Sequence, residues 1–260
     1  MFDNYVLKNG VKKQKMLKLI LIFIGFFIVF NVIPKYPYLR VIKASKLIEQ
    51  GRYKEGLLLF SKVVGKKAID TMTKIRYAFS ELKFGEVEKA KNQLELILKD
   101  DKTSSAMKYE TKAVYALVLF KENKLKEAKE LMLEVYENYK NTNMYCTLGY
   151  LFNILEKPDV AVKFNIEAYD FNSSHNTIID NLGQAYYLNG DYDKAEEIYE
   201  GLLDKSPAFP EAYYNYGLVL LKKGKKDLAN EMFERALAKP FNNLTTVTKE
   251  EIEERIHYHE

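Results

Sequence analysis

The stretch from Asn176 to Pro207, NTIIDNLGQAYYLNGDYDKAEEIYEGLLDKSP, decides how this chain folds. Apolar side chains recur in each half of it at the three- and four-residue spacings of an amphipathic helix. Asn189-Gly190-Asp191 has the composition of a tight turn, and Pro207 ends the second half. The stretch therefore predicts two short helices that each bury one face. The residues expected on those faces are Ile179, Leu182, Tyr186, Ala195, Tyr199, Leu202 and Leu203.

This helix–turn–helix pattern recurs along most of the chain. A glycine and an alanine return every 34 residues, at Gly149, Gly183 and Gly217 and at Ala161, Ala195 and Ala229. A fixed period of this length is typical of stacked helical repeats. In a weaker, earlier copy Asn123 replaces the turn glycine, and both residue types tolerate a positive φ. We count six units, which start near residues 37, 71, 109, 142, 176 and 210, with an inserted loop around Asp100–Ala106.

The recurring positions resemble the tetratricopeptide repeat, which has a large residue, Leu, Gly and Tyr on its first helix and Ala, an aromatic residue, Ala and Pro on its second. The sixth unit carries this pattern as Tyr213, Tyr216, Gly217, Leu220, Ala229, Phe233, Ala236 and Pro240. The fourth unit departs from it with Asn165 at the aromatic position, and Gly56 replaces the second-helix alanine in the first unit. A larger side chain at the first-helix glycine would force the two helices apart. The resemblance covers about residues 37–242 and implies an all-α, right-handed superhelical solenoid of about six repeats.

The N-terminal region differs in composition from the repeats. Residues 1–15 form a basic, polar tail, and residues 16–33 read MLKLILIFIGFFIVFNVI, with Lys18 as their one charge. As a helix these residues would span about 27 Å, roughly the thickness of a bilayer's hydrocarbon core. A cleaved signal peptide would have a shorter apolar stretch and a small-x-small site, which Asn31–Lys35 does not provide. We therefore expect an uncleaved transmembrane helix over residues 16–33.

The distribution of charge bears on orientation and on partners. Five lysines precede or enter the apolar segment, which slightly favours a cytoplasmic N-terminus. The chain is therefore expected in the cell membrane as a single-pass protein, with its repeats outside the cytoplasm. Residues 1–36 hold six Lys and one Asp, so the remaining 34 basic and 35 acidic residues are nearly balanced. This balance gives no electrostatic reason to expect nucleic-acid binding.

No arrangement in the sequence would support catalysis or cofactor binding. It contains no nucleophile elbow, Walker loop, paired CxxC or HExxH motif. The three histidines are too few for a metal site, and His257 and His259 would point to different sides of a helix. The single cysteine, Cys146, excludes an intrachain disulfide and is expected to be a packed thiol. We therefore expect no enzyme, no cofactor and no metal, and we interpret Lys222–Lys226 as a solvated edge.

The remaining candidate for function is the concave surface of the array. The resemblance implies that the first helices line this surface. Asn and Gln side chains can bond both groups of a peptide backbone, and Tyr offers apolar area with a polar tip. Asn181 and Asn215 stand where peptide-binding members of the family often carry Asn, although the Lys and Asn set that holds a C-terminal carboxylate is absent. The predicted partner-binding residues are Asn143, Thr147, Tyr150, Asn153, Asp180, Asn181, Gln184, Tyr187, Tyr214, Asn215 and Leu218.

The end of the chain, residues 243–260, is predicted to form a capping helix. Thr248 and Glu251 have the spacing of a capping box, and Val247, Ile252 and Ile256 supply a narrow apolar stripe. A polar outer face on such a helix keeps the end of a repeat array soluble.

These features predict a membrane-anchored scaffold that binds a peptide or helix of a partner protein in the concave groove. A self-assembling structural component of an envelope complex, stacked through its repeat ends, is the alternative. A further hypothesis concerns the basic first unit, whose residues 37–70 hold eight basic and three acidic side chains. This unit would rest against anionic lipid headgroups.

Overall fold

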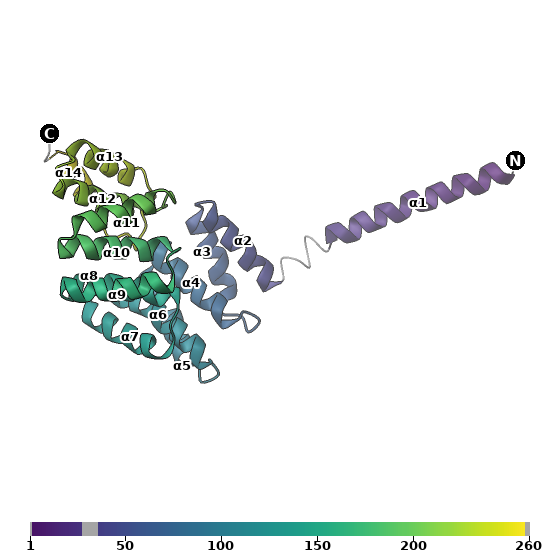
Figure 1. Ribbon diagram of the computed structural model, residues 1–260. Coiled ribbons are helices and arrows are strands. Elements are labelled where there is room, and N and C mark those ends of the chain that lie inside the picture. Colours follow the sequence, from purple (N-terminus) through teal and green to yellow (C-terminus); the bar gives the residue numbers. More distant parts are fainter. Residues whose placement is uncertain (1, 28–35, 258–260) are drawn as a thin grey trace. The chain divides into compact units, whose positions relative to one another are not determined.

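The computed structural model describes residues 2–27 and 36–257, with side chains over 15–27 and 36–256. These residues form 14 helices and no strand (Figure 1). They divide into two compact bodies, an N-terminal body of Met1–Thr73 and a C-terminal body of Lys74–Glu260. The N-terminal body contains α1 (Phe2–Phe27), α2 (Pro37–Glu49) and α3 (Tyr53–Val64). The helices that follow are α4 (Thr71–Phe84, which begins at the boundary), α5 (Val87–Lys99), α6 (Ser105–Lys121), α7 (Leu125–Asn138), α8 (Thr142–Leu155), α9 (Pro158–Phe171), α10 (Asn176–Asn189), α11 (Tyr192–Leu203), α12 (Pro210–Lys222), α13 (Lys226–Leu237) and α14 (Lys249–His257).

Helix α1 covers the predicted basic tail and the first part of the predicted transmembrane segment. The apolar side chains from Met16 to Phe27 are exposed, with Phe23 at 74%. Residues 28–33, the remainder of that segment, lie outside the described residues. Over 2–27 and 36–257, none of the helices has the length and apolar character needed to cross a bilayer. The described residues therefore do not support the predicted transmembrane helix.

Helices α2 and α3 form the first helix pair. They bury Val41, Ala44 and Leu47 from α2 together with Phe60 and Val63 from α3. The pair also explains why glycine replaces alanine in this copy of the repeat. A Cβ added to Gly56 would lie 2.9 Å from the Ala44 carbonyl oxygen, closer than real Cβ atoms approach.

A continuous apolar core runs through the C-terminal body. One cluster joins α4, α5 and α6, a second extends from α6 to α10, and a third extends from α10 to α14. Neighbouring clusters share α6 or α10, so the core connects each helix pair of this body to the next. Five of the residues predicted to face the core are buried, namely Ile179, Leu182, Ala195, Tyr199 and Leu202. The predicted all-α helical repeat fold is confirmed.

The recurring glycines lie where the two helices of a pair come closest. A Cβ at Gly183 would be 2.7 Å from the Tyr199 ring, and one at Gly217 would be 2.4 Å from the Phe233 ring. At Gly149 the opposing side chain is Asn165, whose Oδ1 would lie 2.4 Å from an added Cβ. The expectation that small residues permit close helix approach is confirmed at all three positions.

The turns within the pairs use backbone conformations that the sequence also predicted. Gly51, Gly190 and Gly224 have φ values of 77°, 86° and 75°. Asn123, which replaces the turn glycine, has a φ of 59°. A left-handed residue at this place lets the first helix end and the second begin within a few residues.

Helix α14 continues the array beyond the sixth helix pair. It packs on α13, and its Ile252 is fully buried in the same core cluster as Phe233. The predicted capping box is confirmed, because Thr248 N–H donates to Glu251 Oε2 at 2.7 Å and Glu251 N–H donates to Thr248 Oγ1 at 3.1 Å. The helix begins at Lys249. With this extension the repeat count is about seven rather than the six we predicted.

The close contact at Gly183 leads to a prediction about stability. Gly183→Ala is expected to lower the free energy of unfolding by about 1–3 kcal/mol, because the new methyl group displaces the buried Tyr199 ring. Gly201→Ala is the matched control: Gly201 lies in α11 with nothing within 4 Å of an added Cβ. This control should raise stability by about 0.5–1 kcal/mol through helix propensity. Urea unfolding followed by circular dichroism measures both changes, and equal effects of the two substitutions would contradict the assigned packing.

Candidate functional site

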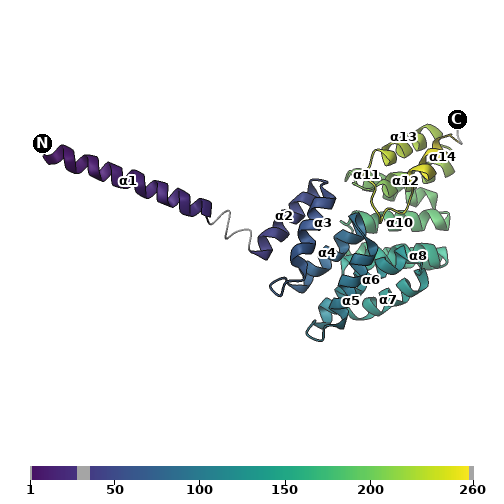
Figure 2. The same cartoon turned by 180° about the vertical axis from the view of Figure 1, so that it is seen from behind.

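All predicted partner-binding residues come from three first helices of the C-terminal body, α8, α10 and α12. In Figures 1 and 2 these helices follow one another in chain order. The Asn141 side chain caps α8 by accepting the Met144 N–H at 2.7 Å, and Pro210 opens α12. Asn143 is exposed, whereas the half-buried residues are Thr147, Tyr150, Gln184, Tyr187, Tyr214, Asn215 and Leu218. Asn153, Asp180 and Asn181 are buried.

Asn181 and Asn215 occupy the same position in successive repeats and make equivalent bonds. Asn181 Nδ2 donates to the Cys146 carbonyl oxygen at 2.8 Å, and Asn215 Nδ2 donates to Asp180 Oδ1 at 3.1 Å. Each amide therefore reaches back to the preceding first helix and ties it to its own. We had expected packing to leave Asp180 and Asn181 available to a ligand. In the structure both side chains instead form hydrogen bonds between neighbouring repeats, because they point toward the adjacent first helix rather than toward solvent.

A second group of buried amides lies between the fourth and fifth repeats. Asn153 Nδ2 donates to the Asn181 carbonyl oxygen and to Gln184 Oε1, both at 2.9 Å. Asn165 Nδ2 donates to Asn153 Oδ1 at 2.8 Å. Asn165 stands opposite Gly149, where the next two pairs place an aromatic ring. The departure from the aromatic pattern therefore supports a polar network between buried amides, in which Asn165 Oδ1 is left without a hydrogen-bond partner.

Asp180 is the most perturbed acid of this surface. It accepts hydrogen bonds from Asn215 and from the Tyr199 hydroxyl, which lies 3.2 Å from Oδ1. Burial raises the pKa of its carboxyl to about 7, and the nearby Glu211 charge adds to this effect, although the two hydrogen bonds oppose it. The group therefore changes charge near neutral pH.

Glu211, in the first turn of α12, was not singled out from the sequence. Burial raises the pKa of its carboxyl. Its Oε1 accepts the Thr246 backbone N–H at 2.7 Å and lies 3.4 Å from the Thr246 hydroxyl. Thr246 belongs to the connection between α13 and α14. The surface formed by the first helices α8, α10 and α12, here named the first-helix face, therefore already binds part of this chain through Glu211.

This connection, residues 242–247, is here named the C-terminal clasp. A turn closes it, since Thr245 N–H donates to the Asn242 carbonyl oxygen at 3.0 Å. At its tip Asn243 donates its N–H to the Lys83 carbonyl oxygen and its Nδ2 to the Gly85 carbonyl oxygen, both at 3.0 Å. Carbonyl groups at the end of a helix such as α4 have no partner within the helix, and the clasp supplies two donors to them. We had predicted that the capping helix begins at residue 243, whereas the helix begins at Lys249; nothing local in the sequence reveals a contact across 158 residues.

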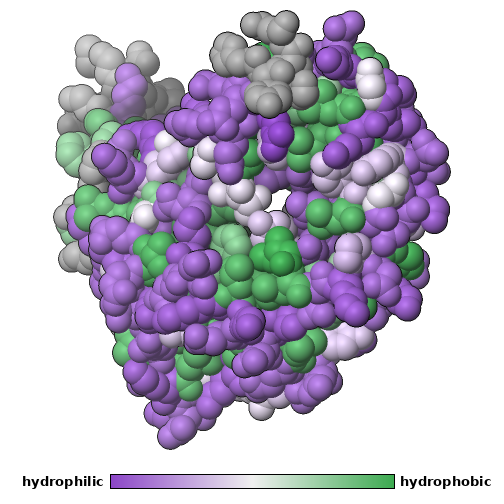
Figure 3. All heavy atoms as spheres, turned by 90° about the vertical axis from the view of Figure 1, so that its left-hand side faces the viewer, coloured by the Kyte–Doolittle hydropathy of each residue, from purple (hydrophilic) through white to green (hydrophobic). Residues whose placement is uncertain are grey.

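Two predicted binding residues also face the C-terminal segment. The Thr246 side chain acts on the Tyr150 hydroxyl and partly offsets the increase in its pKa caused by burial. The positive charge of Arg255 in α14 acts on Tyr187 and likewise opposes a burial-driven increase in pKa. The face seen in Figure 3 is hollowed near its centre, and hydrophobic residues gather beside the hollow.

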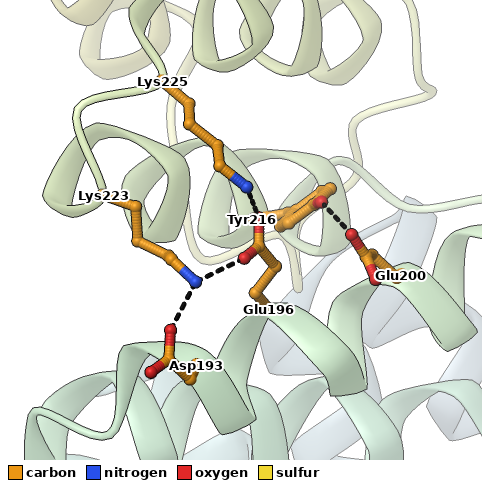
Figure 4. Close-up of polar contacts among 6 residues, drawn as sticks. All are labelled: Asp193, Glu196, Glu200, Tyr216, Lys223 and Lys225. Atoms are coloured by element: carbon orange, nitrogen blue, oxygen red, sulfur yellow. Dashed lines mark hydrogen bonds and ion pairs between the residues drawn. The ribbon is translucent and has the colours of Figure 1, made fainter.

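Ion pairs join the fifth and sixth repeats at the edge of the array (Figure 4). Lys223 and Lys225, from the turn after α12, each bind the buried Glu196 of α11 at 2.6 Å. Lys223 also pairs with Asp193. The interpretation of Lys222–Lys226 as a solvated edge agrees with the exposure of Lys222, Lys225 and Lys226 but omits the ion pairs: Lys223 is half-buried, and Glu196, which is 8% exposed, needs a compensating charge.

The described residues show no sign of a metal or nucleophile site. Across them no three His, Cys, Asp or Glu side chains gather closely enough to hold a metal ion. Cys146 Sγ lies 3.3 Å from His175 Nδ1, a contact that the sequence had not suggested. Burial raises the pKa of the Cys146 thiol to about 12, so the thiol stays protonated at neutral pH and is a poor nucleophile.

Comparison with known proteins supports the assignment of the repeats. A family model described as tetratricopeptide repeat matches residues 181–243. A tetratricopeptide repeat protein from Parabacteroides merdae superposes with a TM-score of 0.66 at 17% sequence identity, covering 96% of this chain and 94% of that one. The chain has a tetratricopeptide repeat fold.

Other solved tetratricopeptide repeat proteins are also similar. A thermophilic one from Thermus thermophilus gives a TM-score of 0.55 at 18% identity, covering 73% of this chain and 98% of its own. YrrB, described as having an unusual peptide-binding site, gives 0.45 at 21% identity, covering 69% and 91%. No curated protein matches the sequence.

The raised pKa of Asp180 predicts how stability depends on pH. Its carboxyl titrates near 3.8 when unfolded and near 7 when folded, so between these values the folded state binds more protons. Stability should therefore fall as the pH rises from about 4 to about 7, by up to about 4 kcal/mol from this group. Asp180→Asn keeps an acceptor for Asn215 and Tyr199 and should flatten this dependence while stabilising the protein above pH 7.

Urea unfolding between pH 5 and 8 measures this effect. Asp193→Asn is the matched control, because Lys223 lowers the pKa of the exposed Asp193 and the substitution should cause only a small loss at neutral pH. An Asp180→Asn variant that keeps the wild-type slope would show that Asp180 is ionised throughout.

Proposed function

We propose that this protein is a scaffold that binds a peptide or helix of a partner protein on the first-helix face of α8, α10 and α12. The observation that carries the proposal is a set of side chains that helix packing leaves partly exposed on three successive first helices. Thr147, Tyr187 and Leu218 come one from each helix and are half-buried. Tyr and Leu supply apolar area to a partner, and the Thr hydroxyl and Tyr phenol add hydrogen bonds. The tetratricopeptide repeat fold supports the same function.

We also propose that residues 16–33 tether the scaffold to a membrane. Support comes from Met16–Phe27, where a helix exposes apolar side chains on every side. A continuous exposed apolar surface of this kind indicates contact with lipid or with another protein. The excess of lysine before the segment supports a cytoplasmic N-terminus, with the repeats outside the cytoplasm.

The binding face is tested by a triple substitution, Thr147→Ala, Tyr187→Ala and Leu218→Ala, in the full-length chain. A photo-crosslinking residue at Asn143, next to the face, reports partner contact in cells. The triple substitution should reduce the crosslinked partner at least tenfold, because central contact residues carry most of the energy of an interface. Lys163→Ala, Glu197→Ala and Glu234→Ala form the matched control, one exposed residue from each second helix, and should leave crosslinking unchanged. Undiminished crosslinking in the first variant would refute the assigned face.

The tether is tested by Ile22→Arg with Phe26→Arg. Each charge costs about 2.5–3.5 kcal/mol at the centre of a membrane helix, so the variant should leave the membrane fraction on alkaline carbonate washing. Ile22→Leu with Phe26→Leu preserves the apolar surface and should stay bound. Protease added to intact cells should digest the repeats of the wild-type chain. Release of the wild-type chain by carbonate would exclude the tether, and protected repeats would reverse the orientation.

A further inference from the structure

The C-terminal clasp is attached to the array in two different ways. On either side of its turn the chain is held by apolar packing, since Phe241 packs on the core cluster of α10–α14 and Val247 is 6% exposed within that cluster. Between these anchors the side chains of Asn243 and Thr246 are exposed. Only hydrogen bonds hold them to the array. The turn of the clasp, residues 242–246, can therefore leave the array while Phe241 and Val247 remain packed.

Two of the groups that face the clasp lie on helices of the proposed binding face, α12 and α8, and the others lie at the end of α4. Glu211, in the first turn of α12, accepts the Thr246 N–H at 2.7 Å and lies 3.4 Å from the Thr246 hydroxyl, and the Thr246 side chain also acts on Tyr150 of α8. The clasp carries no charge: its sequence is Asn242-Asn243-Leu244-Thr245-Thr246-Val247. It meets a carboxylate and helix-end carbonyls, which are acceptors, with backbone N–H, amide and hydroxyl donors. Donor and acceptor are thus complementary across the whole contact.

We propose that the C-terminal clasp is a displaceable intramolecular ligand of the first-helix face, and that the partner segment bound there has the same chemistry. That segment is a short, uncharged turn that carries Asn and Thr or Ser donors for Glu211 and the end of α4. The partner binds only the fraction of molecules in which the clasp is released. This inference rests on the proposed function and specifies the ligand of that site.

The consequence for affinity is that weakening the clasp strengthens binding in trans. A ligand that competes with an internal segment has an apparent dissociation constant equal to the intrinsic one divided by the open fraction. Asn243→Ala with Thr246→Ala removes the hydrogen bond from Asn243 Nδ2 to the Gly85 carbonyl oxygen and the one from the Thr246 hydroxyl to Glu211. Both residues lie in the clasp, so Glu211 and Tyr150 are unchanged. Two lost hydrogen bonds should raise the open fraction about tenfold or more.

The test uses the full-length chain in detergent and a fluorescent peptide with the sequence of residues 241–248, FNNLTTVT. The double variant should bind this peptide at least tenfold more tightly than the wild-type chain. Adding Glu211→Ala to the double variant should abolish that gain, because the acceptor for the threonine N–H is lost. A peptide that carries Thr246→Glu should bind at least tenfold more weakly, since its carboxylate meets that of Glu211.

Hydrogen exchange measures whether the clasp is released in each variant. The Asn243 and Thr246 amides should be protected in the wild-type chain and exchange faster in the double variant, while α10–α12 keep their protection. The proposal is overturned if these amides are unprotected in the wild-type chain, or if the clasp is released in a folded variant that gains no affinity for the peptide. A variant that dimerises in light scattering through exchanged clasps would assign the site to a second copy and also overturn it. If the triple substitution at Thr147, Tyr187 and Leu218 still abolishes partner crosslinking, only the ligand chemistry fails and the proposed function stands.

Discussion

The approach of an aromatic ring to a glycine backbone is the contact on which the repeats depend. Tyr199 and Phe233 lie over Gly183 and Gly217, where any Cβ would overlap the ring. A ring in this position also reaches the next repeat: Tyr199 stacks on Tyr216 with centroids 5.8 Å apart, and its hydroxyl bonds Asp180. One side chain thus sets the distance within a helix pair and the contact between pairs. Packing of this kind transmits the position of each pair to its neighbour.

The fourth repeat shows what replaces the ring when it is absent. Asn165 faces Gly149, and its amide starts a chain of hydrogen bonds through Asn153 to Asn181 and Gln184. Buried amides are costly unless they are paired, and the bonds donated by Asn165 and Asn153 therefore favour this arrangement of the helices, although Asn165 Oδ1 has no partner. The polar contacts therefore specify the register of neighbouring repeats, whereas the apolar core supplies most of the energy.

The sequence predicted the packing positions well because a 34-residue period repeats the same local environment. The glycine contacts and the left-handed Asn123 follow from single residues and their neighbours. The function of the polar residues was harder to predict, because an Asn on a first helix faces either a ligand or the preceding helix, depending on how repeats stack. Asn181 and Asp180 proved to bond between helices. The clasp lay beyond sequence reasoning, because its partners are distant in the chain and its residues are common in solvent-exposed loops.

The clasp also limits what a partner must do. A segment tethered beside its own site competes at an effective concentration in the millimolar range, so a free segment with only the same bonds would displace it poorly. A successful partner must add contacts that the clasp does not make. The half-buried Tyr187 of α10 and Leu218 of α12 lie on the proposed binding face and would supply such contacts. Binding energy from these side chains would open the clasp, and the donors of the partner would then replace those of Asn243 and Thr246. Specificity would thus depend on the apolar residues, while the polar bonds would be exchanged one for another with little net change in free energy.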